Sequence, residues 1–294
     1  TVELGLTGRL DFVDGVMFPS ICDVIRNLSG MWQLMFEGKY VRYFDVPQNF
    51  DDGVGGSYYE TELRLLRDDL AELAGRPVSD DALNASIALY NENRQAIQAL
   101  YDFRATKPWL APTSEVYLVV RAGMVLPVEA HTRLVRDYLA ATEAEDRPLR
   151  DNCRVVLTGA FCEQPPLGLI KSIEMAGCYV VDDDFMLVTR WLLQDVVTDG
   201  DPIANLSQAF LHHSTSTSAK YEPDRDDKGR ALIEAVHRTK AEGVIFAAPS
   251  FCDPALLERP MLQDALRARD IPFTAFKYAE NTGQMQSIRE QAGT

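Results

Sequence analysis

The sequence predicts an α/β protein built from two Rossmann-like or flavodoxin-like doubly wound domains with helical insertions. In both halves of the 294-residue chain, short apolar runs of strand type alternate with helical patterns, which is the rhythm of βαβ units and a parallel sheet. Two distant segments, 15–23 and 243–253, also share one plan: an apolar run, a Pro that breaks it, a cysteine and an aspartate. This repeated plan places a thiol at a strand end in each half of the chain.

The first predicted domain is an N-terminal α/β domain with a helical extension, residues 1–148. A charged linker at 143–151 marks its boundary. Because the chain begins with Thr inside a helical pattern, we expect the native N-terminal segment to be missing. Its expected elements are strands at 11–19 and 41–46, and helices at 23–37, from 57 to Gly75, from Ser79 to about 107 and at 128–145.

The second predicted domain is a C-terminal α/β domain, residues 149–294. Helical segments separate its strand candidates, so it too is expected to be doubly wound. A Ser/Thr-rich stretch at 212–227 is expected to be a loop that crosses either the surface or the cleft between the domains. The strand candidates are 154–158, 178–182, 243–247 and 272–276.

Composition narrows the classes of function. A formal net charge of −15 argues against a nucleic-acid groove, which needs clustered Lys and Arg. No apolar run approaches the roughly 20 residues of a membrane helix, and no charged start precedes a signal-type core. The 5 cysteines include no close-spaced pair and do not resemble a secreted disulfide framework. We therefore expect a cytoplasmic protein that contacts neither nucleic acid nor membrane.

Cysteines recur at strand ends. Cys22 and Cys252 occupy the two matched segments. Cys162 follows the apolar run at 154–158 in a similar way, with a Gly as the strand break and Glu163 as the carboxylate after the cysteine. Ligands bind at the carboxyl ends of parallel strands, so we expect cysteines from both halves to converge on one site. Sulfur ligands favour an iron–sulfur cluster or zinc, and the close-spaced pairs typical of structural zinc are absent. The alternative for any single cysteine is a small buried hydrophobe, and Cys153 and Cys178, at strand starts, are expected to be packing residues.

The neighbours of these cysteines have predicted roles as well. The serine two positions before each cysteine, Ser20 or Ser250, can offer its hydroxyl to the sulfur, and the aspartate that follows can cap the next helix. The amino end of that helix would stabilise a thiolate.

The four histidines carry less information. His212 and His213 are either substrate-facing or a solvated pair at a helix end, and the second interpretation is favoured. His131 and His237 lie in amphipathic helical patterns and are expected at the surface or at a boundary.

An acidic run, Asp182 to Asp184, follows a predicted strand. It could line a cleft, bind a cation or cap a helix. Neither a GxGxxG turn after a strand nor a P-loop is present, so nicotinamide cofactors and ATP have no recognisable cradle. Any hydrolysis of ATP is expected in another chain.

Several multi-residue motifs, in the same order, make the chain resemble the 2-hydroxyacyl-CoA dehydratase and benzoyl-CoA reductase family. Within it the chain is most similar to the smaller cluster-carrying, non-ATPase subunit of ATP-dependent reductases. The motifs are FPSICDVIRNLSGMW at 18–32, KYVRYFDVPQNF at 39–50, GAFCEQPP at 159–166, APSFCDP at 248–254 and KYAENTGQMQ at 277–286.

The resemblance implies a two-domain α/β subunit that binds a 4Fe-4S cluster through three cysteines. Cys22 and Cys252 match the second and third ligands of the family, and the first lies in an N-terminal segment that this chain lacks. Cys162 is the second choice of ligand, or a neighbour of the cluster or the substrate. The implied partners are a homologous cluster subunit, ATPase activator subunits, ferredoxin and an acyl-CoA substrate.

The implied reaction is the ATP-dependent reduction of benzoyl-CoA to a cyclohexadiene-carbonyl-CoA. Electrons of low potential from ferredoxin would pass through a ketyl-type radical of the thioester. One alternative is a 2-hydroxyacyl-CoA dehydratase subunit, which needs only catalytic electrons. Another is a non-catalytic scaffold subunit. The sequence leaves open the proton donor, the subunit that holds the acyl-CoA, and the choice between benzoyl-CoA and substituted analogues.

Overall fold

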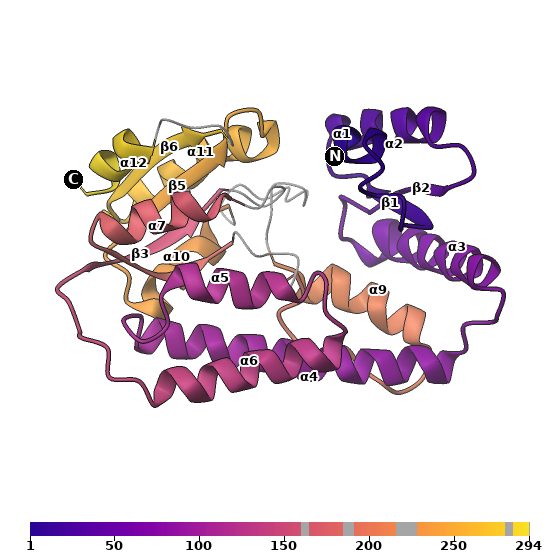
Figure 1. Ribbon diagram of the computed structural model, residues 1–294, viewed down its shortest axis with the longest axis horizontal. Coiled ribbons are helices and arrows are strands. Elements are labelled where there is room, and N and C mark those ends of the chain that lie inside the picture. The colour runs from indigo at the N-terminus through magenta and orange to yellow at the C-terminus, as the bar shows by residue number, and fades with distance from the viewer. Residues whose placement is uncertain (160–164, 185–190, 216–227, 280–284, 294) are drawn as a thin grey trace. The chain divides into compact units, whose positions relative to one another are not determined.

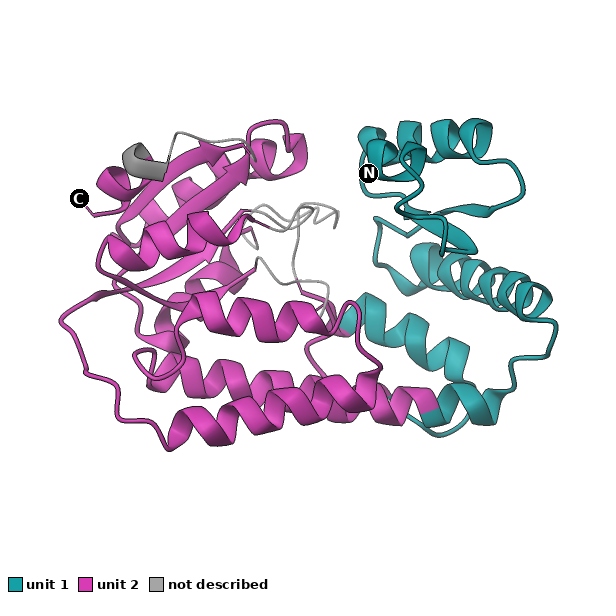
Figure 2. Ribbon diagram, viewed as in Figure 1, with its two compact units in different colours: residues 1–85, 197–212, 219–221 teal, residues 86–196, 213–218, 222–294 magenta. Residues whose placement is uncertain are grey.

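The computed structural model describes residues 1–159, 165–184, 191–215, 228–279 and 285–293 (Figure 1). The described residues form two compact units, each with its own sheet (Figure 2). Unit 1 contains Thr1–Ala85 and Val197–His212, and unit 2 contains Ser86–Val196 and most of the chain from His213 onward.

Unit 1 is built on two parallel strands that are joined by a helix. The ring of Phe18 on the first strand lies 6.0 Å from the ring of Trp32 on that helix, and both side chains are buried. The first strand begins at Gly15 and not at the predicted residue 11, because residues 7–12 form consecutive turns. The elements of unit 1 are α1 Val2–Leu6, β1 Gly15–Pro19, α2 Asp23–Met35, β2 Tyr40–Phe44, the π-helix η1 Asp52–Gly56, α3 Ser57–Ala74, the first turns of α4 Asp80–Thr106, and α9 Pro202–His213.

A late segment of the chain completes the core of unit 1. Phe210 of α9 lies 4.6 Å from the ring of Tyr59 on α3 and 5.0 Å from the ring of Phe50. The hydroxyl of Ser207 donates to the carbonyl oxygen of Gly56 at 3.3 Å. Residues more than a hundred positions apart therefore share one aromatic core.

Unit 2 contains a four-stranded, all-parallel sheet in the order β4-β3-β5-β6. The predicted strands of the second half are confirmed. They could be predicted because buried strands of a parallel sheet are near-continuous apolar runs. Their bounds are β3 Cys153–Thr158, β4 Cys178–Asp183, β5 Gly243–Pro249 and β6 Phe273–Tyr278.

Helices cover both faces of this sheet. Val155 and Leu157 of β3 pack in one cluster with α7 and α12, whereas Val156 packs in another with α10 and α11. Alternate residues of a strand point to opposite faces, so the apolar run at β3 serves two layers. The bounds of these helices are α7 Leu167–Met175, α10 Arg230–Thr239, α11 Asp253–Arg267 and α12 Met285–Ala292. The doubly wound arrangement is confirmed for unit 2, while the described sheet of unit 1 has two strands.

The chain order gives the sheet of unit 2 a topological switch point. From β3 the chain crosses to β4 on one side, and it later enters β5 on the other side of β3. Ligands of open α/β sheets bind outside the carboxyl ends of the strands at such a point.

The helical part of unit 2 consists of most of α4, with α5 Thr113–Ala122 and α6 Val128–Glu143. Leu100, Val116 and Val135 from these helices share a buried cluster with Ile170 of α7. These contacts place α4 to α6 with the second sheet. The bounds of the two compact units therefore differ from those of the predicted domains 1–148 and 149–294. That domain division stays a prediction. None of the described helices combines the length and apolar composition that crossing a bilayer requires.

Candidate functional site

Cys22 lies at the junction of β1 and α2. Its backbone is extended, with φ −161° and ψ 167°, and its carbonyl accepts the first bond of the helix from the amide of Arg26 at 3.2 Å. Cys22 is therefore the N-cap of α2, and its side chain is partly buried. Asp23 is the first helical residue and its carboxylate accepts from the amide of Val24 at 3.0 Å. The predicted strand–cysteine–helix order is confirmed here.

Cys252 occupies the matching place in unit 2. It is the N-cap of α11, it is 8% exposed, and its carbonyl accepts from the amide of Leu256 at 3.1 Å. Asp253 again begins the helix. Both cysteines thus stand at the amino end of a helix, where backbone amide groups favour negative charge.

The serines beside these cysteines bind neighbouring strands. The hydroxyl of Ser20 accepts from the amide of Val46 at 2.7 Å and lies 3.3 Å from its carbonyl oxygen. The hydroxyl of Ser250 donates to the carbonyl of Tyr278 at 2.9 Å. Ser20 thus binds the backbone just after β2, and Ser250 binds the end of β6. That these hydroxyls serve the sulfur atoms stays a prediction.

The remaining cysteines have different environments. Cys162 lies outside the described residues. Cys178 is 3% exposed in the core, where burial raises the pKa of its thiol to about 11, so its role as a packing residue is confirmed. Cys153 is an exposed residue, so it does not pack as predicted. Partial desolvation of its thiol, with the charge of Glu242 nearby, raises the pKa of that thiol.

The two matched cysteines belong to different compact units, Cys22 to unit 1 and Cys252 to unit 2. Within the described part of the chain, no three His, Cys, Asp or Glu side chains form a group that could hold a metal ion. The donor chemistry fits a soft metal centre, since both residues are cysteines at helix amino ends. Their convergence on one site stays a prediction.

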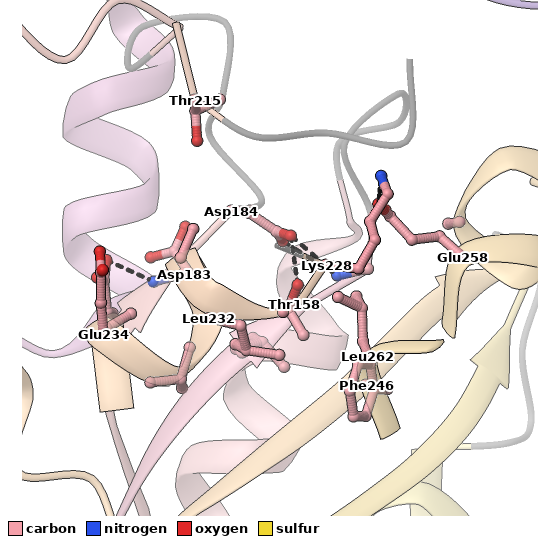
Figure 3. Close-up of a pocket in the computed structure, with 18 of the residues that line it drawn as sticks. Thr158, Asp183, Asp184, Thr215, Lys228, Leu232, Glu234, Phe246, Glu258 and Leu262 are labelled. Atoms are coloured by element: carbon pink, nitrogen blue, oxygen red, sulfur yellow. Dashed lines mark hydrogen bonds and ion pairs between the residues drawn. The ribbon is translucent and has the colours of Figure 1, made fainter. Parts of the chain in front are cut away.

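The acidic run lines a cavity of about 290 Å³ in unit 2 (Figure 3). Asp182 and Asp183 end β4, and Asp184 follows them. Of the predicted roles, lining a cleft is confirmed. The cavity is formed by the ends of β3 and β4 and by side chains of α10 and α11, such as Leu232 and Leu262.

Two of these aspartates form ion pairs. The carboxylate of Asp183 lies 2.6 Å from the guanidinium of Arg104 on α4, and both side chains are almost fully buried. Asp182 pairs with Arg238 of α10 at 2.5 Å. The sequence did contain a signal for Arg104, which follows the buried Ile97, Leu100 and Tyr101 on one face of α4.

Asp184 is held by the end of β3. Its carboxylate accepts from the hydroxyl of Thr158 and from the amide of Gly159 at 3.1 Å. Gly159 has φ +111°, a conformation that other residues rarely adopt. Burial, reinforced by the charge of Asp183, raises the pKa of Asp184 to about 7. The carboxyl group is therefore substantially protonated at neutral pH.

The histidines lie apart from this cavity. His131 is 1% exposed, so its predicted surface position is wrong. Its ring nitrogens lie 2.9 Å from the amide nitrogen of Asn93 and 3.0 Å from the carbonyl of Val119, and burial lowers the pKa of the ring. His212 is exposed at the end of α9, 2.9 Å from Asp52, and His237 is exposed on α10. Neither of these two lines the cavity.

Comparison with known proteins places these features in a family. The model of the 2-hydroxyglutaryl-CoA dehydratase D-component family matches residues 1–294, so the chain belongs to that family.

Among curated relatives, a benzoyl-CoA reductase subunit of Thauera aromatica is 63% identical over 294 residues, which are 100% of this chain and 76% of that protein. The (R)-phenyllactyl-CoA dehydratase beta subunit of Clostridium sporogenes is 24% identical over 100% of this chain and 76% of that protein. The (R)-2-hydroxyglutaryl-CoA dehydratase beta subunit of Acidaminococcus fermentans is 25% identical over 99% of this chain and 78% of that protein.

Proposed function

We propose that the chain is the iron–sulfur subunit of an ATP-dependent benzoyl-CoA reductase. The observation that supports this most is the identity of 63% to a benzoyl-CoA reductase subunit along the whole chain, against 24% and 25% to two dehydratase subunits. The product would be a cyclohexadiene-carbonyl-CoA. The enzyme is an oxidoreductase acting on CH-CH groups, as part of a multi-subunit complex.

In this proposal Cys22 and Cys252 are ligands of a 4Fe-4S cluster. When bound, such a cluster supplies single electrons of low potential. The chain's own contribution is to hold two thiolates at helix amino ends, where the amide groups lower the cost of their charge. The serine bonds to neighbouring strands fix both strand ends and with them the positions of the two cysteines. Cys162 is the second choice of ligand, or a neighbour of the cluster or the substrate.

The proposed partners follow from the same assignment. The catalytic pair is completed by a homologous cluster subunit, separate activator subunits hydrolyse ATP, and ferredoxin supplies electrons in the cytoplasm. The chain has no P-loop that could cradle ATP, which is consistent with hydrolysis in a partner.

Iron and acid-labile sulfide analysis with low-temperature EPR tests the cluster. The complex is purified without oxygen, and Cys22→Ser and Cys252→Ser are compared with wild type. Each variant is expected to lose about one four-iron cluster and its ring-reducing activity, because serine is a poor ligand for this cluster. Cys153→Ser, which changes an exposed thiol at a strand start, is the matched control and should keep both. Full iron content in the Cys22 and Cys252 variants would contradict the assignment.

A dehydratase subunit is the second candidate, because the family model bears the name of a dehydratase component. The use of ATP separates the two functions. A reductase consumes ATP in proportion to product, whereas a dehydratase needs a brief activation and then turns over without ATP. A scaffold subunit would instead show no iron of its own.

A further inference from the structure

The cavity of unit 2 has the position of a ligand site. It opens at the carboxyl ends of β3 and β4, beside the switch point between β3 and β5. Its lining is mixed: Thr158 and Asp184 provide polar atoms, while Leu232, Leu262 and Phe246 provide an apolar wall (Figure 3). A concave, largely apolar site with a few convergent polar groups is what small-molecule recognition requires.

Most charges around this cavity are already matched. Asp183 pairs with Arg104, Asp182 pairs with Arg238, and Lys228 pairs with Glu258 at 3.0 Å. A strongly charged ligand would have to compete with these pairs. The arrangement therefore favours an uncharged group inside the cavity.

Asp184 differs from the other carboxylates. It faces the cavity, is partly exposed as a residue, and is held by Thr158 and Gly159. Burial of its carboxyl group, reinforced by the charges of Asp183 and Glu258, disfavours ionisation and raises its pKa to about 7. A protonated carboxyl at this point can donate a hydrogen bond to an acceptor oxygen. The titratable and charged groups that line the cavity with it are Asp182, Asp183, Lys228, Glu234, Arg238 and Glu258.

We propose that this cavity receives the acyl group of an aryl-CoA thioester, whose carbonyl oxygen accepts a hydrogen bond from Asp184 while the ring lies against Leu232 and Leu262. The proposal rests on the proposed function for the choice of thioester. The volume of about 290 Å³ is sufficient, because an apolar cavity of about 150 Å³ already holds benzene. A hydrogen bond to the carbonyl oxygen would strengthen as negative charge develops there during reduction.

The test uses the complete complex with benzoyl-CoA, measuring KM, kcat/KM against pH, and equilibrium binding without ATP. Asp184→Ala is expected to raise KM and Kd about tenfold, because the thioester loses one hydrogen bond. In wild type, kcat/KM should fall as the pH rises through about 7, because the ionised carboxylate no longer donates. Asp184→Asn keeps an amide donor, so its KM should rise less and the fall of kcat/KM with pH should disappear.

Leu232→Phe places a larger side chain in the apolar wall, which narrows the cavity, and it leaves the contacts of Asp184 in place. It should raise KM while the pH dependence of wild type is kept. Asp264→Asn, on the exposed side of α11, is the matched control and should change neither quantity. If wild type reduces benzoyl-CoA but Asp184→Asn and Leu232→Phe both keep its Kd, KM and pH profile, the site is overturned and the proposed function stands. If wild type neither binds nor reduces benzoyl-CoA, both are overturned.

Discussion

The two strand–cysteine–helix segments share their local structure and differ in their surroundings. In each, a serine ties the strand end to the next strand and the cysteine caps a helix. Yet every residue of β5 is buried, whereas β1 has one fully buried residue, Phe18. The reason is that β5 lies between two strands with helices on both faces, while β1 pairs with one strand among the residues that the structure describes. A short motif thus determines the turn and the cap, and the surrounding sheet determines the burial.

The largest difference between the two segments is expected in the free energy of unfolding, when a residue at equivalent positions is replaced by alanine. Ile245 of β5 is 2% exposed and Met17, its counterpart in β1, is 46% exposed. Ile245→Ala is expected to lower the free energy of unfolding by about 2–5 kcal/mol, since it leaves a cavity in a packed core. Met17→Ala should change it by less than about 0.5 kcal/mol. Urea denaturation measures both, and equal losses would refute the contrast.

The two units should also respond to pH with opposite sign. Burial raises the pKa of Asp184 in unit 2 to about 7, so the stability it contributes is present below its unfolded pKa of about 4 and is lost as the pH rises through 7. Hydrogen bonds from Tyr40 and Arg42 lower the pKa of Asp69 in unit 1, so its contribution is lost as the pH falls through that lowered value.

Denaturation of Asp184→Asn and Asp69→Asn over a range of pH measures this difference. Asp184→Asn should gain stability relative to wild type as the pH rises, and the deficit of Asp69→Asn should shrink as the pH falls. A constant difference from wild type at all pH values would disprove the assigned shift for that residue.

Removal of the two serine hydroxyls should separate the two segments by the smallest difference. Ser20→Ala leaves the amide of Val46 without its acceptor, at a cost of about 1 kcal/mol. Ser250→Ala should cost less, because the amide of residue 250 still donates to Tyr278 at 2.8 Å. Hydrogen exchange at Val46 reports the first loss directly, and unchanged protection there would argue against that bond.

The sequence predicts what depends on local pattern. The strands of unit 2 are predictable because they are buried apolar runs, and the cysteine caps because a strand break precedes each. Prediction fails where the partner is distant: the pattern around His131 indicates a surface position because the Asn93 that binds it lies on another helix. The apolar face of α4 indicates that Arg104 is buried, but no local pattern indicates its partner Asp183, which lies 79 positions away. The choice of ligands for the proposed cluster comes from family resemblance and not from such patterns.

The return of α9 to unit 1 sets an order of events during synthesis. Tyr59 finds its ring partner Phe210 only after 151 further residues have left the ribosome, and these residues include β3 and β4 of the other unit. Contacts of such long sequence separation form slowly. A nascent chain that stalls before α9 therefore exposes the aromatic rings of unit 1, which makes this stretch of translation the period when a chaperone has most to protect.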